Sequence, residues 1–157
     1  MKFTLVKDLR KDRVMKPILS GFLVFTLLYL LSDIFVKQST FGIFPHAIET
    51  SLFGNEEEFL DGLSQASFLE LWHVEIFFIM MIAFTTSTVY IRLSGASKTA
   101  LLAVNIMLLT ALLSLVTLAL AYYLSPHFIY IYVSSFFIWH IVAFFCTLIS
   151  LKRLHYA

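Results

Sequence analysis

Two histidines stand in nearly identical apolar surroundings in this sequence. The stretch LWHVEIFF covers residues 71–78 and the stretch IWHIVAFF covers residues 138–145, so His73 and His140 each follow a tryptophan. A histidine can ligate a metal through either ring nitrogen, and histidines on facing helices of a bundle can hold a haem iron from both sides. His73 and His140 are therefore the candidate ligands of a shared haem b.

A second candidate metal site consists of Glu70 and His73, which lie three positions apart and share one helix face. Glu-x-x-His is the spacing of carboxylate-bridged di-metal bundles, but those sites need a second copy and further glutamates. The structural alternative is that Ser67 and Glu70 form a capping box, S-x-x-E, at the start of a helix. On that interpretation Glu70 stabilises a helix start and binds no metal.

Three more polar residues fall within or beside apolar runs: Asp33, Glu75 and Asn105. An ionisable residue inside a membrane span is a functional-site hypothesis by default, because burying it is costly. The single cysteine, Cys146, excludes an intrachain disulfide and a cysteine-based metal motif. No pairing of a nucleophile with a base is evident, so we expect no catalytic activity of the chain on its own.

The composition decides which elements position these residues. Hydrophobic residues make up 60% of the 157 positions and charged residues only 13%, which is too apolar for a soluble domain. A bilayer core of about 30 Å needs about 20 apolar residues per helix, and four runs qualify. The sequence predicts an all-α integral membrane four-helix bundle, up-down-up-down, as a single membrane domain over residues 1–157, with spans at about 17–36, 68–92, 99–124 and 128–151.

Basic residues predict the orientation of this bundle. Ten of the eleven lysines and arginines fall on one side of the four predicted spans, and only Lys37 falls on the other. By the positive-inside rule both termini are cytoplasmic, and we expect a bacterial inner membrane. The ten residues on the predicted cytoplasmic side are Lys2, Lys7, Arg10, Lys11, Arg13, Lys16, Arg92, Lys98, Lys152 and Arg153.

The segment 37–66 is predicted to be an acidic extracytoplasmic loop that is partly helical. Pro45 suits the first turn of a short helix, and Asn55 before Glu56, Glu57 and Glu58 predicts a second capped helix. The loop also carries many apolar side chains. We therefore expect it to lie on the membrane surface or to form a lid on the bundle.

The two Trp-His stretches fall in the second helix of each predicted hairpin, as a pseudo-twofold repeat would require. Counted from the predicted helix starts, His73 lies about 9 Å and His140 about 18 Å into its span. Two ligands of one iron must lie at nearly the same height. The pair therefore fits a haem only if the second helix projects outward or tilts.

Three functional hypotheses follow from these patterns. The first is a haem-b-binding electron-transfer subunit of a membrane redox complex, with His73 and His140 as ligands. The second is a cofactor-free structural or assembly subunit that packs against other membrane chains. The third is a small ion- or proton-conducting oligomer. All three place the chain in the lipid bilayer with other subunits or further copies of itself as partners, and the net charge of +1 gives no indication of nucleic acid.

Overall fold

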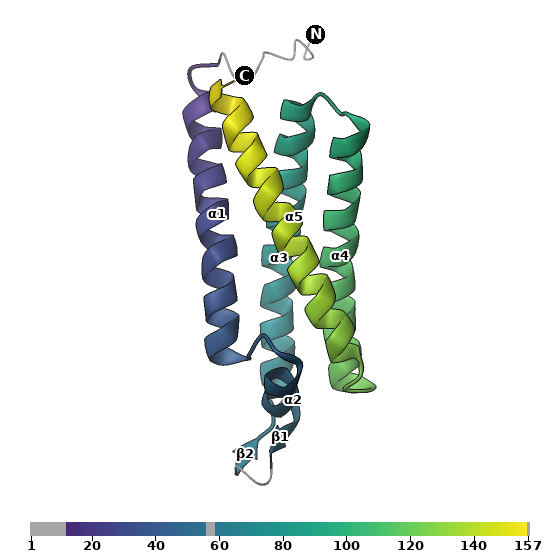
Figure 1. Cartoon of the computed structure of the whole chain (residues 1–157). Helices are drawn as coiled ribbons and strands as arrows, with labels where there is room; N and C mark the ends of the chain where they lie inside the picture. The colour runs from purple at the N-terminus through teal and green to yellow at the C-terminus, as the bar shows by residue number, and fades with distance from the viewer. Residues whose placement is uncertain (1–11, 56–58, 157) are drawn as a thin grey trace, which may run out of the picture.

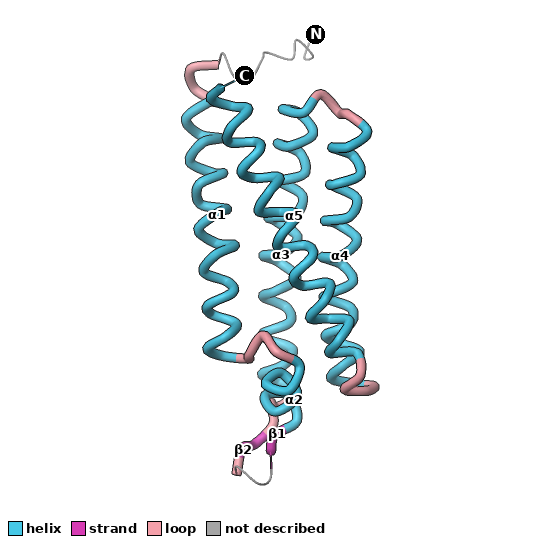
Figure 2. Tube along the Cα trace, viewed as in Figure 1, coloured by secondary structure: helices cyan, strands magenta, loops and turns pink. Residues whose placement is uncertain are grey.

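A computed structural model describes residues 12–55 and 59–156 of the chain. Four of its helices are long and apolar enough to cross a membrane. A short helix and a two-stranded hairpin lie between the first and second of them (Figures 1 and 2). The elements in chain order are α1 (Met15–Thr40), α2 (Pro45–Phe53), β1 (Gly54–Asn55), β2 (Leu60–Asp61), α3 (Gln65–Ser94), α4 (Lys98–Tyr123) and α5 (Phe128–Tyr156).

The predicted all-α, up-down-up-down bundle is confirmed. Helix α1 begins and α5 ends at the same end of the bundle, which we call the terminal end, and the opposite end is the α2 end (Figure 1). Helices α3 and α5 both run from the α2 end to the terminal end. Helix α5 crosses the bundle diagonally and packs against α1, α3 and α4, whereas α1 packs mainly on α5. This arrangement leaves α1 and α3 as the two walls of an open side.

The orientation of the bundle in the membrane stays a prediction. Four of the basic residues on which it rests, Lys2, Lys7, Arg10 and Lys11, lie outside the described residues. The connection between α3 and α4 lies at the terminal end, as the predicted topology requires (Figure 1). Gly95 adopts the left-handed conformation at φ 67° and closes α3, as its position after the apolar run predicted.

The predicted start of the second span was wrong by three residues. Helix α3 begins at Gln65, and its N-cap is Ser64, whose side chain accepts a hydrogen bond from the Ser67 amide at 3.2 Å. Ser67 therefore occupies the third position of the helix, and Glu70 lies too far along to complete a capping box. The apolar residues indicated correctly where the hydrophobic part of the span begins, but a more polar first turn of α3 precedes it.

The first span was predicted too short at its far end. Helix α1 continues past residue 36 to Thr40, and the hydroxyl groups of Ser39 and Thr40 donate to the Val36 carbonyl. Lys37 consequently lies within the helix and is buried, not in the loop that follows. The one basic residue assigned to the extracytoplasmic side is thus part of the bundle interior.

The predicted partly helical loop between the first two spans is confirmed, although its second helix is not, and it packs on the end of the bundle as a lid. Pro45 opens α2 as predicted. Asn55 lies in β1 and pairs with Leu60 of β2, and Glu56, Glu57 and Glu58 lie outside the described residues. An apolar cluster joins this lid to α3, α4 and α5 at the α2 end, with Phe68 stacked on Tyr122 at a ring distance of 4.0 Å.

Small side chains allow α4 and α5 to pack closely. Ser114, Thr117 and Ala121 are buried along one face of α4, and the two hydroxyl groups donate to carbonyls of their own helix. Because the hydroxyls are satisfied within the helix, this stripe behaves as a packing face in an apolar medium.

Candidate functional site

Four ionisable side chains from three helices meet inside the bundle near the α2 end. Asp33 and Lys37 lie one helical turn apart on α1, Glu75 lies on α3, and His140 lies on α5. Their side chains are 16%, 11%, 13% and 3% exposed, respectively. Such burial of charge in a membrane bundle requires that the groups satisfy one another.

The His140 ring is bonded through both of its nitrogens. Its Nδ1 lies 3.1 Å from the Phe136 carbonyl oxygen, and because a carbonyl only accepts, Nδ1 must carry a hydrogen. Its Nε2 lies 3.0 Å from Oδ2 of Asp33, and a proton must lie between these two atoms, since two lone pairs would repel. His140 and Asp33 therefore share one proton and are neutral as a pair.

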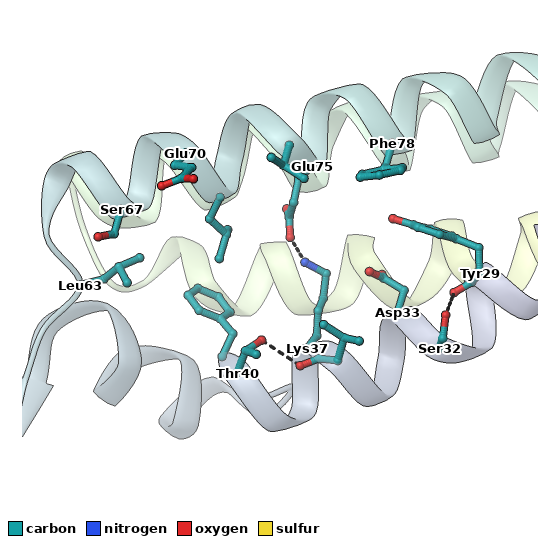
Figure 3. Close-up of a pocket in the computed structure, with 14 residues that line it drawn as sticks. Tyr29, Ser32, Asp33, Lys37, Thr40, Leu63, Ser67, Glu70, Glu75 and Phe78 are labelled. Atoms are coloured by element: carbon teal, nitrogen blue, oxygen red, sulfur yellow. Dashed lines mark hydrogen bonds and ion pairs between the residues drawn. The ribbon is translucent and has the colours of Figure 1, made fainter.

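The second pair joins the two walls of the open side. The Lys37 ammonium forms an ion pair with the Glu75 carboxylate and lies 5.4 Å from the centre of the Phe136 ring (Figure 3). The two pairs together carry no net charge. A balanced cluster of this kind is what a low-dielectric interior tolerates, whereas removal of one member would leave a buried charge without a partner.

The cluster opens into a cleft of about 590 Å³ between α1 and α3. Figure 3 shows Asp33, Lys37 and Glu75 directed into this space from the two helices. Most of the remaining wall is apolar. The lining residues are Tyr29, Ser32, Asp33, Val36, Lys37, Thr40, Phe41, Leu63, Ser67, Glu70, Leu71, Val74, Glu75 and Phe78.

The two ends of the cleft differ in chemistry. At the inner end the Tyr29 ring stacks on Phe78 with their centres 5.5 Å apart, and the Tyr29 hydroxyl lies near Asp33 (Figure 3). At the end nearer α2, Glu70 and Ser67 line the cleft and are exposed. Glu70 and Phe78 are eight residues apart on one helix, so the cleft extends about 12 Å along the bundle axis.

The prediction that both histidines face the bundle interior is confirmed for His140 and wrong for His73, which is exposed on α3. Lys37 contacts both Glu75 and Phe136, so these two residues lie at similar depth. His73 precedes Glu75 by two residues and His140 follows Phe136 by four, on parallel helices. The two histidines are therefore about 9 Å apart in height.

These positions do not fit a haem iron held between His73 and His140. One ring is exposed, the other already uses both nitrogens, and their heights differ. Haem binding by the chain stays a prediction.

The pair of Glu70 and His73 gains no third ligand in the part of the chain that the structure describes. Within residues 12–55 and 59–156, no group of three or more His, Cys, Asp or Glu side chains could hold a metal ion. Asn105 also takes no part in the cluster, because its side chain is exposed on α4.

Sequence analysis identified Asp33, Glu75 and His140 individually but missed Lys37 and Tyr29. The available signal was spacing: Tyr29, Asp33 and Lys37 follow one another at four-residue intervals and so share one face of a helix. The predicted span ended at residue 36, so Lys37 was placed just outside it. Asp33 and Lys37 lie one helical turn apart at the end of the predicted span, and this spacing on one face indicates that the helix continues through Lys37.

Comparisons with known proteins agree with this architecture. Residues 42–157, which include α2 to α5, match the family Aq_1264_TM, described as a transmembrane helical domain. Comparisons with curated proteins and with solved structures give no match. The family match covers most of the chain and the four apolar helices agree with it. The chain is thus an integral membrane protein and belongs to the Aq_1264_TM family of transmembrane helical domains.

Proposed function

We propose that this membrane protein binds an amphiphilic molecule from the bilayer in the cleft between α1 and α3. The observation that carries the proposal is the composition of the cleft: apolar walls with a few charged groups placed among them. Binding sites for small molecules are commonly concave and apolar with a few polar groups that orient the ligand, and a volume of about 590 Å³ lies within their usual range.

The position of the cleft suits a ligand that is partly polar. Glu70 precedes Glu75 by five residues and Tyr130 precedes Phe136 by six on a helix of the same direction, so Glu70 and Tyr130 lie at similar height. We infer that exposed aromatic residues such as Tyr130 lie at the membrane interface, with Tyr29 and Phe78 deeper. The apolar part of an amphiphile would lie along Leu71, Val74 and Phe78, and its polar part near Glu70. Because α1 packs mainly on α5, the ligand can enter sideways from the lipid.

Retention of lipid by the purified protein tests this proposal. The protein is reconstituted in bilayers of phosphatidylethanolamine and phosphatidylglycerol, then released into detergent and weighed by native mass spectrometry. Lipids that only surround the bundle are lost, but one in the cleft stays. We expect wild-type protein to retain an amphiphile, and Val74→Trp to lose it, because the indole fills the cleft.

Val116→Trp is the matched control. Val116 on α4 is 44% exposed and Val74 is 45% exposed, but only Val74 lines the cleft. The control should retain the amphiphile as wild type does. Retention by Val74→Trp equal to that of the control, or no retention by the wild type, would refute the proposal.

Orientation is the second part of the proposal. We infer from the basic residues that the terminal end faces the cytoplasm and that the cleft opens toward the outer leaflet of an inner membrane. Cysteines introduced at Ser39 and Thr99, both exposed and at opposite ends, should react from opposite sides of sealed vesicles. Cys146 is buried and does not compete. Reaction of both from one side would contradict this orientation.

The other hypotheses from the sequence are not needed for this function. A structural subunit and a conducting oligomer both remain predictions that concern partners or copies outside the described chain. The buried Asp33–His140 pair holds a proton, but the smaller cleft beside His140 is lined by Leu30, Ile34 and other apolar groups of α1 and α5 and provides no polar path.

A further inference from the structure

We infer that the cleft selects an amphiphile whose headgroup carries a positive charge. This inference rests on the proposed function and names the class of ligand. Four charged side chains line the cleft: Asp33, Lys37, Glu70 and Glu75. Lys37 offsets Glu75, and His140 offsets Asp33 from behind the wall. Glu70 remains, and among the described residues it forms no ion pair.

The surroundings of Glu70 add to this negative charge. Of the lysines and arginines in the described residues, only Lys37 lies in the half of the bundle toward α2, and it is already paired with Glu75. The exposed acidic residues Glu49 and Asp61 lie at the same end. A cation approaching the cleft is therefore attracted, whereas an anionic headgroup meets like charge at the mouth.

The inner walls also suit a cation with an apolar body. Phe78 and Tyr29 form the aromatic inner end of the cleft, about 12 Å from Glu70, where they can contact the apolar body of the ligand. Leu71 and Val74 lie on α3 between Glu70 and Phe78 and provide apolar contact. A headgroup at Glu70 thus places the remainder of the ligand along the apolar wall, without breaking the Lys37–Glu75 pair.

Two ions of nearly the same shape and opposite charge test the inference. Tetraphenylphosphonium and tetraphenylborate are titrated by equilibrium dialysis against the protein in phosphatidylcholine nanodiscs, with empty nanodiscs as the blank. We expect the phosphonium ion to bind with at least tenfold higher affinity than the borate ion after subtraction of the blank. Glu70→Gln should weaken phosphonium binding about tenfold, because it removes one charge near the bound cation.

Glu49→Gln is the matched control, since it makes the same change at the same end but outside the cleft. Its affinity for the phosphonium ion should equal that of the wild type. Preference for the borate ion, equal binding of the two ions, or equal effects of Glu70→Gln and Glu49→Gln would overturn the inference. The lipid-retention experiment with Val74→Trp does not depend on headgroup charge. If Val74→Trp loses the amphiphile but the two ions bind equally, or the borate ion binds better, the cleft is confirmed as a binding site and only the charge preference is rejected.

Discussion

The two Trp-His segments, residues 71–78 and 138–145, are alike in sequence and different in environment. Trp72 is partly exposed and donates its indole N–H to the Leu115 carbonyl of α4 at 2.9 Å, and His73 beside it is exposed. Trp139 is fully buried, and His140 is 3% exposed between the rings of Trp139 and Phe136. Neighbouring positions on a helix point about 100° apart. Both can be buried only where the helix has neighbours on several sides, as α5 has and α3 does not.

Both segments nevertheless reach the same charge cluster, through different positions. The first segment contributes Glu75, two residues after its histidine, and the equivalent position in the second segment is Val142. The second segment contributes His140 itself. The two segments therefore both contribute to the charge cluster, but through different positions of the motif. Which position contributes depends on which side of the helix faces α1.

The largest expected difference between the segments is in the effect of removing each histidine. His140→Ala leaves the Asp33 carboxylate without its partner in an apolar bundle, and we expect a loss of about 2–3 kcal/mol of stability. His73→Ala should change stability by less than about 0.5 kcal/mol. Unfolding in mixed micelles, followed by circular dichroism against the fraction of dodecyl sulfate, measures both.

A second substitution makes this comparison sharper. Asp33→Asn in the His140→Ala background should recover part of the lost stability, because it removes the unpaired charge. Equal destabilisation by the two histidine variants would show that the environments of the two segments do not differ as described.

A smaller effect is expected at the residue through which the first segment joins the cluster. Lys37→Met leaves Glu75 buried without a counter-charge and should lower stability by about 1–2 kcal/mol. The double variant Lys37→Met, Glu75→Leu should recover most of that loss, because no unpaired charge remains. Lys98→Met is the control, since Lys98 is exposed at the terminal end. If the double variant is less stable than Lys37→Met alone, Glu75 does not depend on Lys37.

The smallest expected effect is spectroscopic and compares the two tryptophans directly. Trp139→Phe leaves Trp72 as the only tryptophan, and Trp72→Phe leaves Trp139. Brominated phosphatidylcholine quenches indole fluorescence on contact, so it should quench Trp72 more strongly than the fully buried Trp139. Equal quenching in the two variants would indicate that α5 is no more enclosed than α3.

The fold was largely predictable because its signals are local. Runs of about 20 apolar residues define the spans, Pro45 opens α2, and Gly95 ends α3 in the left-handed conformation that glycine accepts. Errors concentrated at helix ends. Ser64 rather than Ser67 caps α3, and α1 continues through Lys37, because a polar helical turn is not distinguished from a loop by apolarity alone.

The candidate site was predictable only in part. Asp33, Glu75 and His140 were recognisable as ionisable residues near or within apolar runs, since burying such groups in a bilayer requires a partner. The sequence could not name those partners. It paired His140 with His73 on the strength of a repeated motif, whereas the structure pairs His140 with Asp33 and Lys37 with Glu75.

The sequence by itself determined that this chain crosses the membrane four times and that its polar residues must be satisfied inside a bundle. Composition and run length suffice for that, because they reflect transfer of each segment into an apolar medium. Only the tertiary structure decided which groups satisfy one another and where the cleft lies. Those features depend on the rotation of each helix about its axis and on the packing of α1 against α5, which leaves α3 on the far side of the cleft. The helix rotations and the packing of α1 are both set by contacts between residues far apart in the chain.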